Sequence, residues 1–364
     1  MQTPIRSVQA LRAVAALLVL IFHFDVQLHR LGYTGQWAIW PQRGVDIFFI
    51  ISGLVMYLST SGRKVGVGEF YLRRILRIAP LYYLLTIFLV AILLAAPVLS
   101  ANSALSWWHV ALSLVFIPSL HPTFQMPYPV LIPGWTLNCE MLFYLVFGGT
   151  LLLPETRRVA TTSFLLALIV LAASFAPKHS AVFELYGWSI LLEFSLGLAL
   201  GAAVHAGRYL PASQAWWWLL GGVVALTNPF AESARVLVGG LPALAIVASV
   251  VSLEKANRLT VPKVAVALGN ASYSLYLSQQ VTLAAVTQVF LKLGLVASPW
   301  ALMLYMPTAI ICAIAAAFII YYSLELPLSR VLLFSKFWIR RDNIGRNLQK
   351  MSEENDFGVR SNVV

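Results

Sequence analysis

The amino-acid sequence predicts an all-α, multi-pass membrane protein with about ten transmembrane helices and both termini in the cytoplasm. The first observation is composition: of the 364 residues, 60% are hydrophobic and only 11% are charged, and the mean hydropathy is +0.81. A soluble domain carries about 25% charged residues. The second observation is that the apolar residues form long segments, and the third is that Lys and Arg gather in the connections between them.

Ten mainly apolar segments are expected to cross the bilayer. They cover residues 8–28, 45–60, 78–96, 136–153, 160–176, 185–204, 216–227, 236–253, 268–291 and 300–324. Segment 216–227 is short for a crossing, but its loss would move the basic C-terminal region outside, against the positive-inside rule. Residues 105–117 are expected to form an interfacial or re-entrant piece within an outer loop, 97–134, whose prolines favour a stiff lid.

The distribution of basic residues predicts the orientation. With a cytoplasmic N-terminus, 20 of the 25 Lys and Arg residues fall inside. The remaining five, which fall outside, are Arg30, Arg43, Lys178, Arg235 and Lys292. This bias is typical of the positive-inside rule and favours cytoplasmic termini. We expect a membrane domain over residues 1–335 and a short polar cytoplasmic tail over residues 336–364.

Composition also argues against two other kinds of site. The net charge of +11 would suit nucleic-acid binding only on a solvated basic face, whereas these basic residues lie between hydrophobic segments. Cys139 and Cys312 lie in separate apolar segments without metal-ligand spacing, so neither a disulfide framework nor a metal site is expected.

The first apolar segment, residues 8–28, is too long for the core of a signal peptide, and we expect it to be retained in the protein.

The first segment, VQALRAVAALLVLIFHFDVQL, carries two ionisable residues inside its apolar run. Arg12 and His23 are eleven residues apart, which is within about 20° of three helical turns, so they share one face roughly 16 Å apart. Taken singly, Arg12 could reach the headgroups and His23 could bond a neighbouring helix. Together they place a fixed cation and a proton-transfer group on one face, which favours a functional role.

Acidic residues are expected beside His23 at the outer end of the membrane. Asp46 begins the second segment and Glu140 the fourth. A buried carboxylate is costly unless paired, and it could orient His23 and stabilise its protonated form. We therefore predict catalytic roles for His23, Asp46 and Glu140, with helix capping as the alternative for either carboxylate. Trp135 and Asn138 suit either a sugar site or an ordinary interfacial belt.

The inner side of the predicted bundle is basic. The segment FYLRRILRIAPLYYLL places Arg73, Arg74 and Arg77 within about one helical turn, and Arg12 enters from the same side. Such a cluster can fix topology or bind lipid headgroups. It also suits a multiply phosphorylated anion held by bidentate contacts. Phosphates inside and an imidazole farther out fit a long donor lying across the membrane, which is the shape of coenzyme A.

Six motifs together resemble those of the acyltransferase-3 family of integral membrane proteins, especially its exopolysaccharide-modifying members. They are IRSVQALRAVAALLVLIFHF, GVDIFFIISGLVM, FYLRRILRIAPLYYLL, PGWTLNCEMLFY, LGNASYSLYLSQQ and LELPLSR, in family order over residues 5–330. The resemblance matches the family's essential Arg and His, its basic motif and its acidic residue to Arg12, His23, Arg73, Arg74, Arg77 and Glu140. After SLYL the family commonly has a histidine, where this chain has Gln279 or Gln280. An amide cannot transfer protons, so that helix is expected to shape the pocket.

The resemblance implies a ten-helix enzyme of the bacterial cell inner membrane that takes acyl groups from cytoplasmic acyl-CoA. The implied reaction is O-acylation, usually acetylation, of an exopolysaccharide or its lipid-linked repeat unit on the periplasmic side. Many relatives carry a further hydrolase-like domain after the last span, and its absence here favours a stand-alone enzyme. Expected partners are membrane lipids, the carbohydrate or lipid-linked oligosaccharide acceptor, and polysaccharide assembly machinery.

We expect acetyl-CoA to act as donor substrate, with its phosphates on the arginine cluster and Arg12 along its arm. His23 then either deprotonates the sugar hydroxyl or carries the acetyl group itself. The sequence leaves open these two routes, the acceptor sugar and its hydroxyl, the acyl group and the oligomeric state. The competing interpretation is a proton-coupled transporter of sugars or lipid-linked glycans, which the lack of repeated halves disfavours. A scaffold role would leave Arg12 and His23 unexplained.

Overall fold

A computed structural model describes residues 5–35, 37–95, 105–177, 180–227, 235–296 and 299–331, and it is helical without strands over these residues. The helices are α1 (Arg6–Phe22), α2 (Phe24–Arg30), η1 (Trp40–Arg43), α3 (Gly44–Thr60), α4 (Val67–Ala95), α5 (Trp107–Leu114), η3 (Ile132–Gly134), α6 (Trp135–Thr150), α7 (Glu155–Ser174), α8 (Ala181–Tyr186), η4 (Ser189–Leu192), α9 (Glu193–His205), α10 (Ala212–Leu226), η6 (Val236–Gly240), α11 (Leu241–Lys255), α12 (Lys263–Asn270), α13 (Ser272–Lys292), α14 (Pro299–Ile320) and η7 (Tyr321–Glu325). The predicted all-α class is confirmed. The predicted polar tail lies outside the described residues.

Six helical stretches of the described chain are long and apolar enough to cross a membrane. They are Arg6–Arg30, Trp40–Thr60, Val67–Ala95, Glu155–Ser174, Val236–Lys255 and Trp300–Val331. The other predicted segments coincide with α6, α9, α10 and α13, which are shorter or more polar. The number of crossings and the side of the termini therefore stay predictions.

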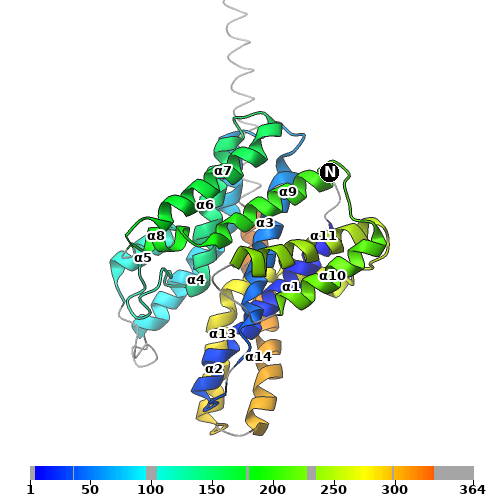
Figure 1. The fold of residues 1–364 in the computed structure, drawn as a ribbon. Helices are drawn as coiled ribbons and strands as arrows, with labels where there is room; N and C mark the ends of the chain where they lie inside the picture. The colour runs from blue at the N-terminus through cyan, green and yellow to red at the C-terminus, as the bar shows by residue number, and fades with distance from the viewer. Residues whose placement is uncertain are drawn as a thin grey trace, which may run out of the picture.

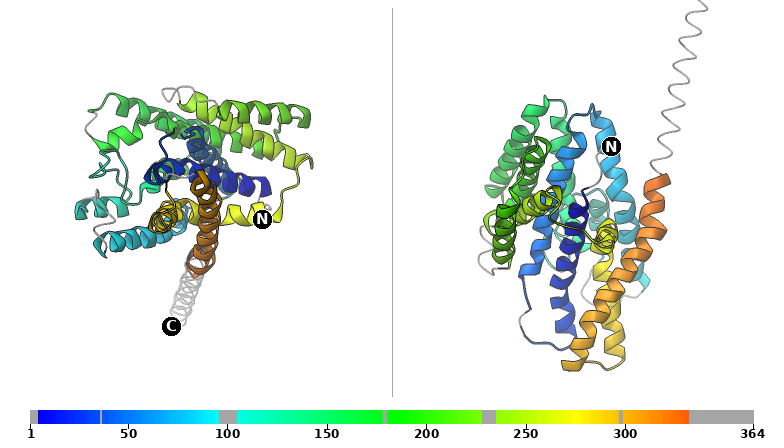
Figure 2. Two further views of the ribbon diagram at one scale, coloured as in Figure 1. Left: turned by 90° about the horizontal axis from the view of Figure 1, so that it is seen from below. Right: turned by 90° about the vertical axis from the view of Figure 1, so that its right-hand side faces the viewer.

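The helices α1 and α3 lie at the centre of the bundle, as Figures 1 and 2 show. α3 packs along α9, and α1 packs against both α3 and α12. Outside this centre, α10 pairs with α11 and α13 pairs with α14 (Figure 1). The first helix can therefore line an interior site, because about half of the residues in its apolar stretch are buried among neighbouring helices.

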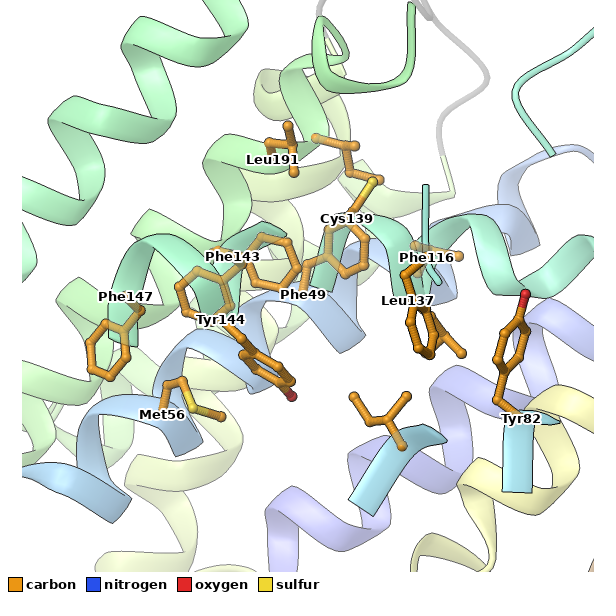
Figure 3. Close-up of a cluster of buried hydrophobic side chains, with 14 of the residues drawn as sticks. Phe49, Met56, Tyr82, Phe116, Leu137, Cys139, Phe143, Tyr144, Phe147 and Leu191 are labelled. Carbon is orange, nitrogen blue, oxygen red and sulfur yellow. The ribbon is translucent and has the colours of Figure 1, made fainter. Parts of the chain in front are cut away.

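An aromatic core joins α3, α6 and α9. The ring of Phe194 stacks on Phe49 and on Phe143, with both pairs of ring centroids 4.3 Å apart. Figure 3 shows the cluster, in which Phe143 and Phe147 come from α6 and Met56 from α3. Buried aromatic rings contribute large apolar areas and fix helix positions through their shape. This core holds α6 against α3, which sets one wall of the site described below.

Small residues allow α3 and α9 to cross closely. A Cβ atom added at Gly53 would lie 2.3 Å from the carbonyl oxygen of Phe194, and one added at Gly197 would lie 2.2 Å from that of Ile50. Such distances admit only glycine, because real Cβ contacts are longer than 3 Å. Backbone contact through small residues is a common way for helices to associate in membranes.

The beginning of α1 is held by α11. The backbone N–H groups of Arg6 and Ser7 donate to the two carboxylate oxygens of Glu254 at 3.0 and 2.9 Å, and the Ser7 hydroxyl donates to the same group at 2.5 Å. A carboxylate is favoured there because the first N–H groups of a helix lack partners within the helix. This contact anchors the helix that carries Arg12 and His23.

Within residues 105–117, the structure has the short helix α5, and the interfacial or re-entrant position predicted for this segment stays a prediction. α5 packs against α4, since the Tyr82 hydroxyl donates to the carbonyl of Ser113 at 3.2 Å. The hydroxyl of Ser113 in turn accepts the N–H of Val130 at 3.1 Å, which ties the loop back onto α5. These bonds attach the segment around Val130 to α5, and α5 to α4.

Candidate active site

Three adjoining cavities lie along α1, named here for the predicted cytoplasmic and periplasmic sides. The inner cavity measures about 420 Å³, the middle one about 100 Å³ and the outer one about 570 Å³. Arg12 lines the inner and middle cavities, and His23 lines the outer one. The middle and outer cavities share Val45 and Tyr276 as wall residues. The predicted cation and imidazole thus lie along one series of cavities through the protein.

The inner cavity is lined by all three arginines of the predicted phosphate site. Arg73 is largely exposed and forms an ion pair with Glu69, one turn earlier on α4. Arg74 is held more firmly, because its Nη2 donates to the Ser59 hydroxyl at 3.2 Å and its guanidinium lies 5.5 Å from the ring centroid of Phe70. Guanidinium groups bind phosphates through paired N–H donors. This wall therefore has the chemistry that a phosphorylated donor requires.

Glu325 is an acidic residue of the inner cavity that sequence reasoning did not single out. It ends the π-helix η7, and its Oε2 accepts a 2.5 Å hydrogen bond from the hydroxyl of Ser274 on α13. Glu325 and Glu140 attract the guanidinium of Arg12, whereas Arg77 repels it. The available signal was the motif LELPLSR, which contains Glu325. A π-helical turn often marks a functional site.

Glu140 lies in the middle cavity. Its Oε1 accepts a hydrogen bond from the Ser52 hydroxyl at 3.1 Å and another from the hydroxyl of Tyr144, one turn later on α6. It shares this cavity with Arg12, whereas His23 lines the outer cavity. The structure therefore groups the predicted carboxylate with the arginines, where it balances their charge.

His23 lies at a break in the first helical segment, between the end of α1 at Phe22 and the start of α2 at Phe24. Its ring Nδ1 is 2.8 Å from the carbonyl oxygen of Val19. Because a carbonyl only accepts hydrogen bonds, Nδ1 carries the proton and a neutral ring has its lone pair on Nε2. A backbone carbonyl thus orients the imidazole, a role that the sequence analysis had given to a carboxylate.

Asp46 lies behind the wall of the outer cavity. Its buried carboxylate accepts a hydrogen bond from Nη2 of Arg235 at 3.3 Å, and buried Glu193 lies beside it. Among the described residues, the structure records no hydrogen bond between Asp46 and His23, and Asp46 lies in the first turn of α3, where a negative charge is favoured. The position of Asp46 is that of a residue holding Arg235 in place.

The two predicted sugar-site residues have different surroundings. Trp135 lines the outer cavity together with Trp188, and their ring centroids are 5.3 Å apart in an edge-to-face arrangement. Asn138 is buried one turn further along α6, and both polar atoms of its side chain lack a hydrogen-bond partner. Trp135 can therefore form an aromatic wall for a sugar ring. Asn138 lies outside the residues that line the three cavities.

Tyr276 stands between the middle and outer cavities and was not predicted as a site residue. Its hydroxyl lies 2.9 Å from the Thr136 hydroxyl and 3.2 Å from the carbonyl oxygen of Pro133. The tyrosine belongs to SLYL, three residues before Gln279, which is buried. Its ring lines both the middle and the outer cavity. In the described part of the chain, no three His, Cys, Asp or Glu side chains gather as a metal site.

The comparisons with known proteins address what this arrangement does. Residues 5–322 match the family model Acyl_transf_3, described as an acyltransferase domain. The chain belongs to the acyltransferase-3 family. It is 36% identical over 308 residues to the exopolysaccharide production protein ExoZ of Rhizobium meliloti, covering 83% of this chain and 94% of that protein. No solved structure matches the chain.

Two more distant relatives match shorter regions. One is the O-acetyltransferase OatA of Staphylococcus aureus, 29% identical over an alignment of 184 positions that covers 44% of this chain and 28% of that protein. The other is the acyltransferase MdmB of Streptomyces mycarofaciens, 33% identical over an alignment of 111 positions that covers 28% of this chain and 26% of that protein. With the apolar helices, these matches identify this family member as a multi-pass membrane O-acyltransferase.

Proposed function

We propose that the protein transfers an acetyl group from cytoplasmic acetyl-CoA to a sugar hydroxyl of an exopolysaccharide, or of its lipid-linked repeat unit, on the periplasmic side of the inner membrane. The observation that carries this proposal is the series of three cavities, which places an arginine-lined wall at one end and the imidazole of His23 at the other. The relative ExoZ is named for exopolysaccharide production, which supports a carbohydrate acceptor.

On the donor side, the arginines of the inner cavity hold the phosphates of acetyl-CoA. Arg74 and Arg77 line both the inner and middle cavities, so they lie where the phosphorylated head and the pantetheine arm meet. Arg12 lies beside the arm, balanced by Glu140 and Glu325. These interactions leave the arm directed past Tyr276 towards the outer cavity.

In the outer cavity, Nε2 of His23 removes the proton from the acceptor hydroxyl. The hydroxyl oxygen then forms a bond to the thioester carbonyl carbon, the carbon–sulfur bond breaks, and the thiolate of CoA leaves and takes up the proton. The alternative is attack by Nε2 on the thioester carbonyl carbon, which breaks the carbon–sulfur bond, releases the CoA thiolate and gives an acetyl-histidine. The acceptor hydroxyl then attacks this acetyl group, the carbon–nitrogen bond breaks, and the hydroxyl proton passes to the thiolate. Both routes need the lone pair on Nε2, which the bond from Nδ1 to Val19 provides.

The proposed topology has ten crossings with both termini in the cytoplasm. The arginines of α4 then face the compartment that contains acetyl-CoA, and the outer cavity opens on the periplasmic side. Membrane lipids surround the bundle, and a polysaccharide assembly system would supply the acceptor. Cysteine labelling of the connections from either side of intact cells would test this orientation directly.

The central experiment uses inside-out membrane vesicles supplied with acetyl-CoA labelled in its acetyl group. Label in saccharide and release of CoA are followed for the wild type, His23→Ala and the matched control His29→Ala, whose ring is exposed on α2. General base catalysis contributes about 10²- to 10⁴-fold, so His23→Ala should lose at least 100-fold in transfer while the control keeps it. Equal transfer by both variants would remove His23 from the mechanism, and transfer by none would reject acetyl transfer.

A further inference from the structure

The outer cavity contains two arginines that the reaction proposed above does not use. Arg43 and Arg235 line it, and its wall includes no carboxylate. Arg43 is only 7% exposed, and its Nε is buried without a hydrogen-bond partner. The Nε of Arg235 is likewise buried and unpartnered. Leaving a buried N–H of a cation unpartnered is unfavourable, so these donors point to a ligand.

The surrounding structure fixes both guanidinium groups. Asp46 forms an ion pair with Arg235, and the buried carboxyl group of Glu193 lies beside Asp46 and interacts electrostatically with both arginines, although neither carboxyl group lines the cavity. Gly239 in the π-helix η6 brings the backbone against this pair, because a Cβ there would lie 2.1 Å from Oδ1 of Asp46 and 3.0 Å from Nη1 of Arg43. The arginines are therefore held in a built site rather than on a mobile surface.

The helix termini around the cavity add to its positive potential. Arg43 is the residue before α3, and Val45 in the first turn of that helix lines the cavity. Trp135, the first residue of α6, lines it as well. Helix N-termini carry a partial positive charge and unpaired N–H groups, which favours an anion nearby. The helix dipoles and the guanidinium groups thus both favour a negatively charged ligand.

We propose that Arg43 and Arg235 bind an oxyanion of the acceptor, a phosphate or a carboxylate, while a hydroxyl of the same molecule reaches His23. This assignment rests on the proposed acetyl transfer. It adds the chemical class of the acceptor, which is an acidic saccharide or a saccharide on a phosphorylated lipid. The phosphates of the donor lie in the inner cavity, so the acceptor supplies the anion in the outer one.

Three acceptors distinguish the two sources of the anion. They are an oligosaccharide containing a uronic acid, its carboxyl-reduced form, and the carboxyl-reduced form attached to a polyprenyl diphosphate. KM for each is measured with the wild type, Arg43→Gln and the control Arg30→Gln on α2, whose side chain bonds Gln27 outside the cavity. Loss of a charge-assisted bond predicts a rise of at least tenfold in KM for Arg43→Gln, equivalent to about 1.4 kcal/mol.

A rise confined to the uronic-acid acceptor identifies a carboxylate, and a rise confined to the diphosphate lipid identifies a phosphate. Unchanged KM for all three acceptors overturns the proposal while leaving acetyl transfer intact. If the wild type modifies none of them, acetyl transfer to such acceptors fails. Binding of the same labelled acceptors to the protein in nanodiscs, without acetyl-CoA, then decides the anion site separately: equal affinity of the wild type and Arg43→Gln overturns it.

The variant Arg235→Gln leaves Asp46 without its cation and can fail to fold for that reason. The double variant Arg235→Gln with Asp46→Asn replaces the ion pair by two amides and removes this difficulty. It should show the same selective loss of affinity for anionic acceptors as Arg43→Gln. Normal affinity in a folded double variant would exclude Arg235 from the site.

Discussion

Replacing Gly53 by alanine tests whether the close crossing of α3 and α9 supports the site. The added Cβ would lie 2.3 Å from the carbonyl oxygen of Phe194 and 2.8 Å from the backbone nitrogen of Leu198. Both are backbone atoms of α9, so neither can move aside as a flexible side chain would. Because ordinary contacts begin at 3.4 Å, the two helices must separate by about 1 Å.

The expected effect is a net loss of about 1–2 kcal/mol in the free energy of unfolding. Forced overpacking costs about 1–3 kcal/mol, and the gain in helix propensity from glycine to alanine offsets up to about 1 kcal/mol. α3 also carries Val45 and Ser52 into the middle cavity, so turnover should fall as well. Denaturant unfolding in one lipid–detergent mixture measures the stability.

Gly149→Ala is the matched control, because a Cβ at this position in α6 meets no atom within 4 Å. The Gly149→Ala variant has the same gain in helix propensity without a steric clash, so its free energy of unfolding should equal or exceed that of the wild type. If Gly53→Ala is as stable as Gly149→Ala, the crossing does not depend on backbone contact and the reasoning is refuted.

Three further predictions concern the cavities and the loop. Tyr276→Phe removes the hydroxyl bonds between the middle and outer cavities, so CoA release to water should rise relative to sugar acetylation; an unchanged ratio argues against a barrier there. Arg77→Gln should raise KM for acetyl-CoA at least tenfold, and more than Arg73→Gln, because Arg73 is exposed and already paired; equal effects contradict this ranking. Burial and then the neighbouring His121 lower the pKa of His109 to about 4, and burial also lowers the pKa of His121. These neutral rings stabilise the loop fully above pH 6.5, and this contribution is lost as the pH falls below that value towards 4. The protection factors of residues 107–131 against hydrogen exchange, which are corrected for the intrinsic effect of pH on exchange, should therefore fall as the pH is lowered from 7 to 5. Protection factors that stay constant over this pH range would refute the dependence of loop stability on the two neutral histidines.

The sequence determined the fold class and the position of most helices, because apolar runs of this length have few other solutions. A backbone in lipid must satisfy its hydrogen bonds internally, which leaves helices as the outcome for such segments. The spacing of Arg12 and His23 also placed both on the cavity side of α1, since helical geometry relates residues eleven apart. Motif order was enough to indicate the family, which the family model confirmed.

The partners of these residues were decided only by the tertiary structure. The sequence placed Asp46 and Glu140 beside His23, but helix packing puts Glu140 among the arginines and Asp46 against Arg235, which is 189 residues away in the chain. Hydropathy gives the depth of a residue in the membrane. It does not give the rotation of each helix about its axis, and that rotation depends on contacts such as Gly53 against α9. The roles of Tyr276 and of the outer arginines therefore emerge only once the helices are packed.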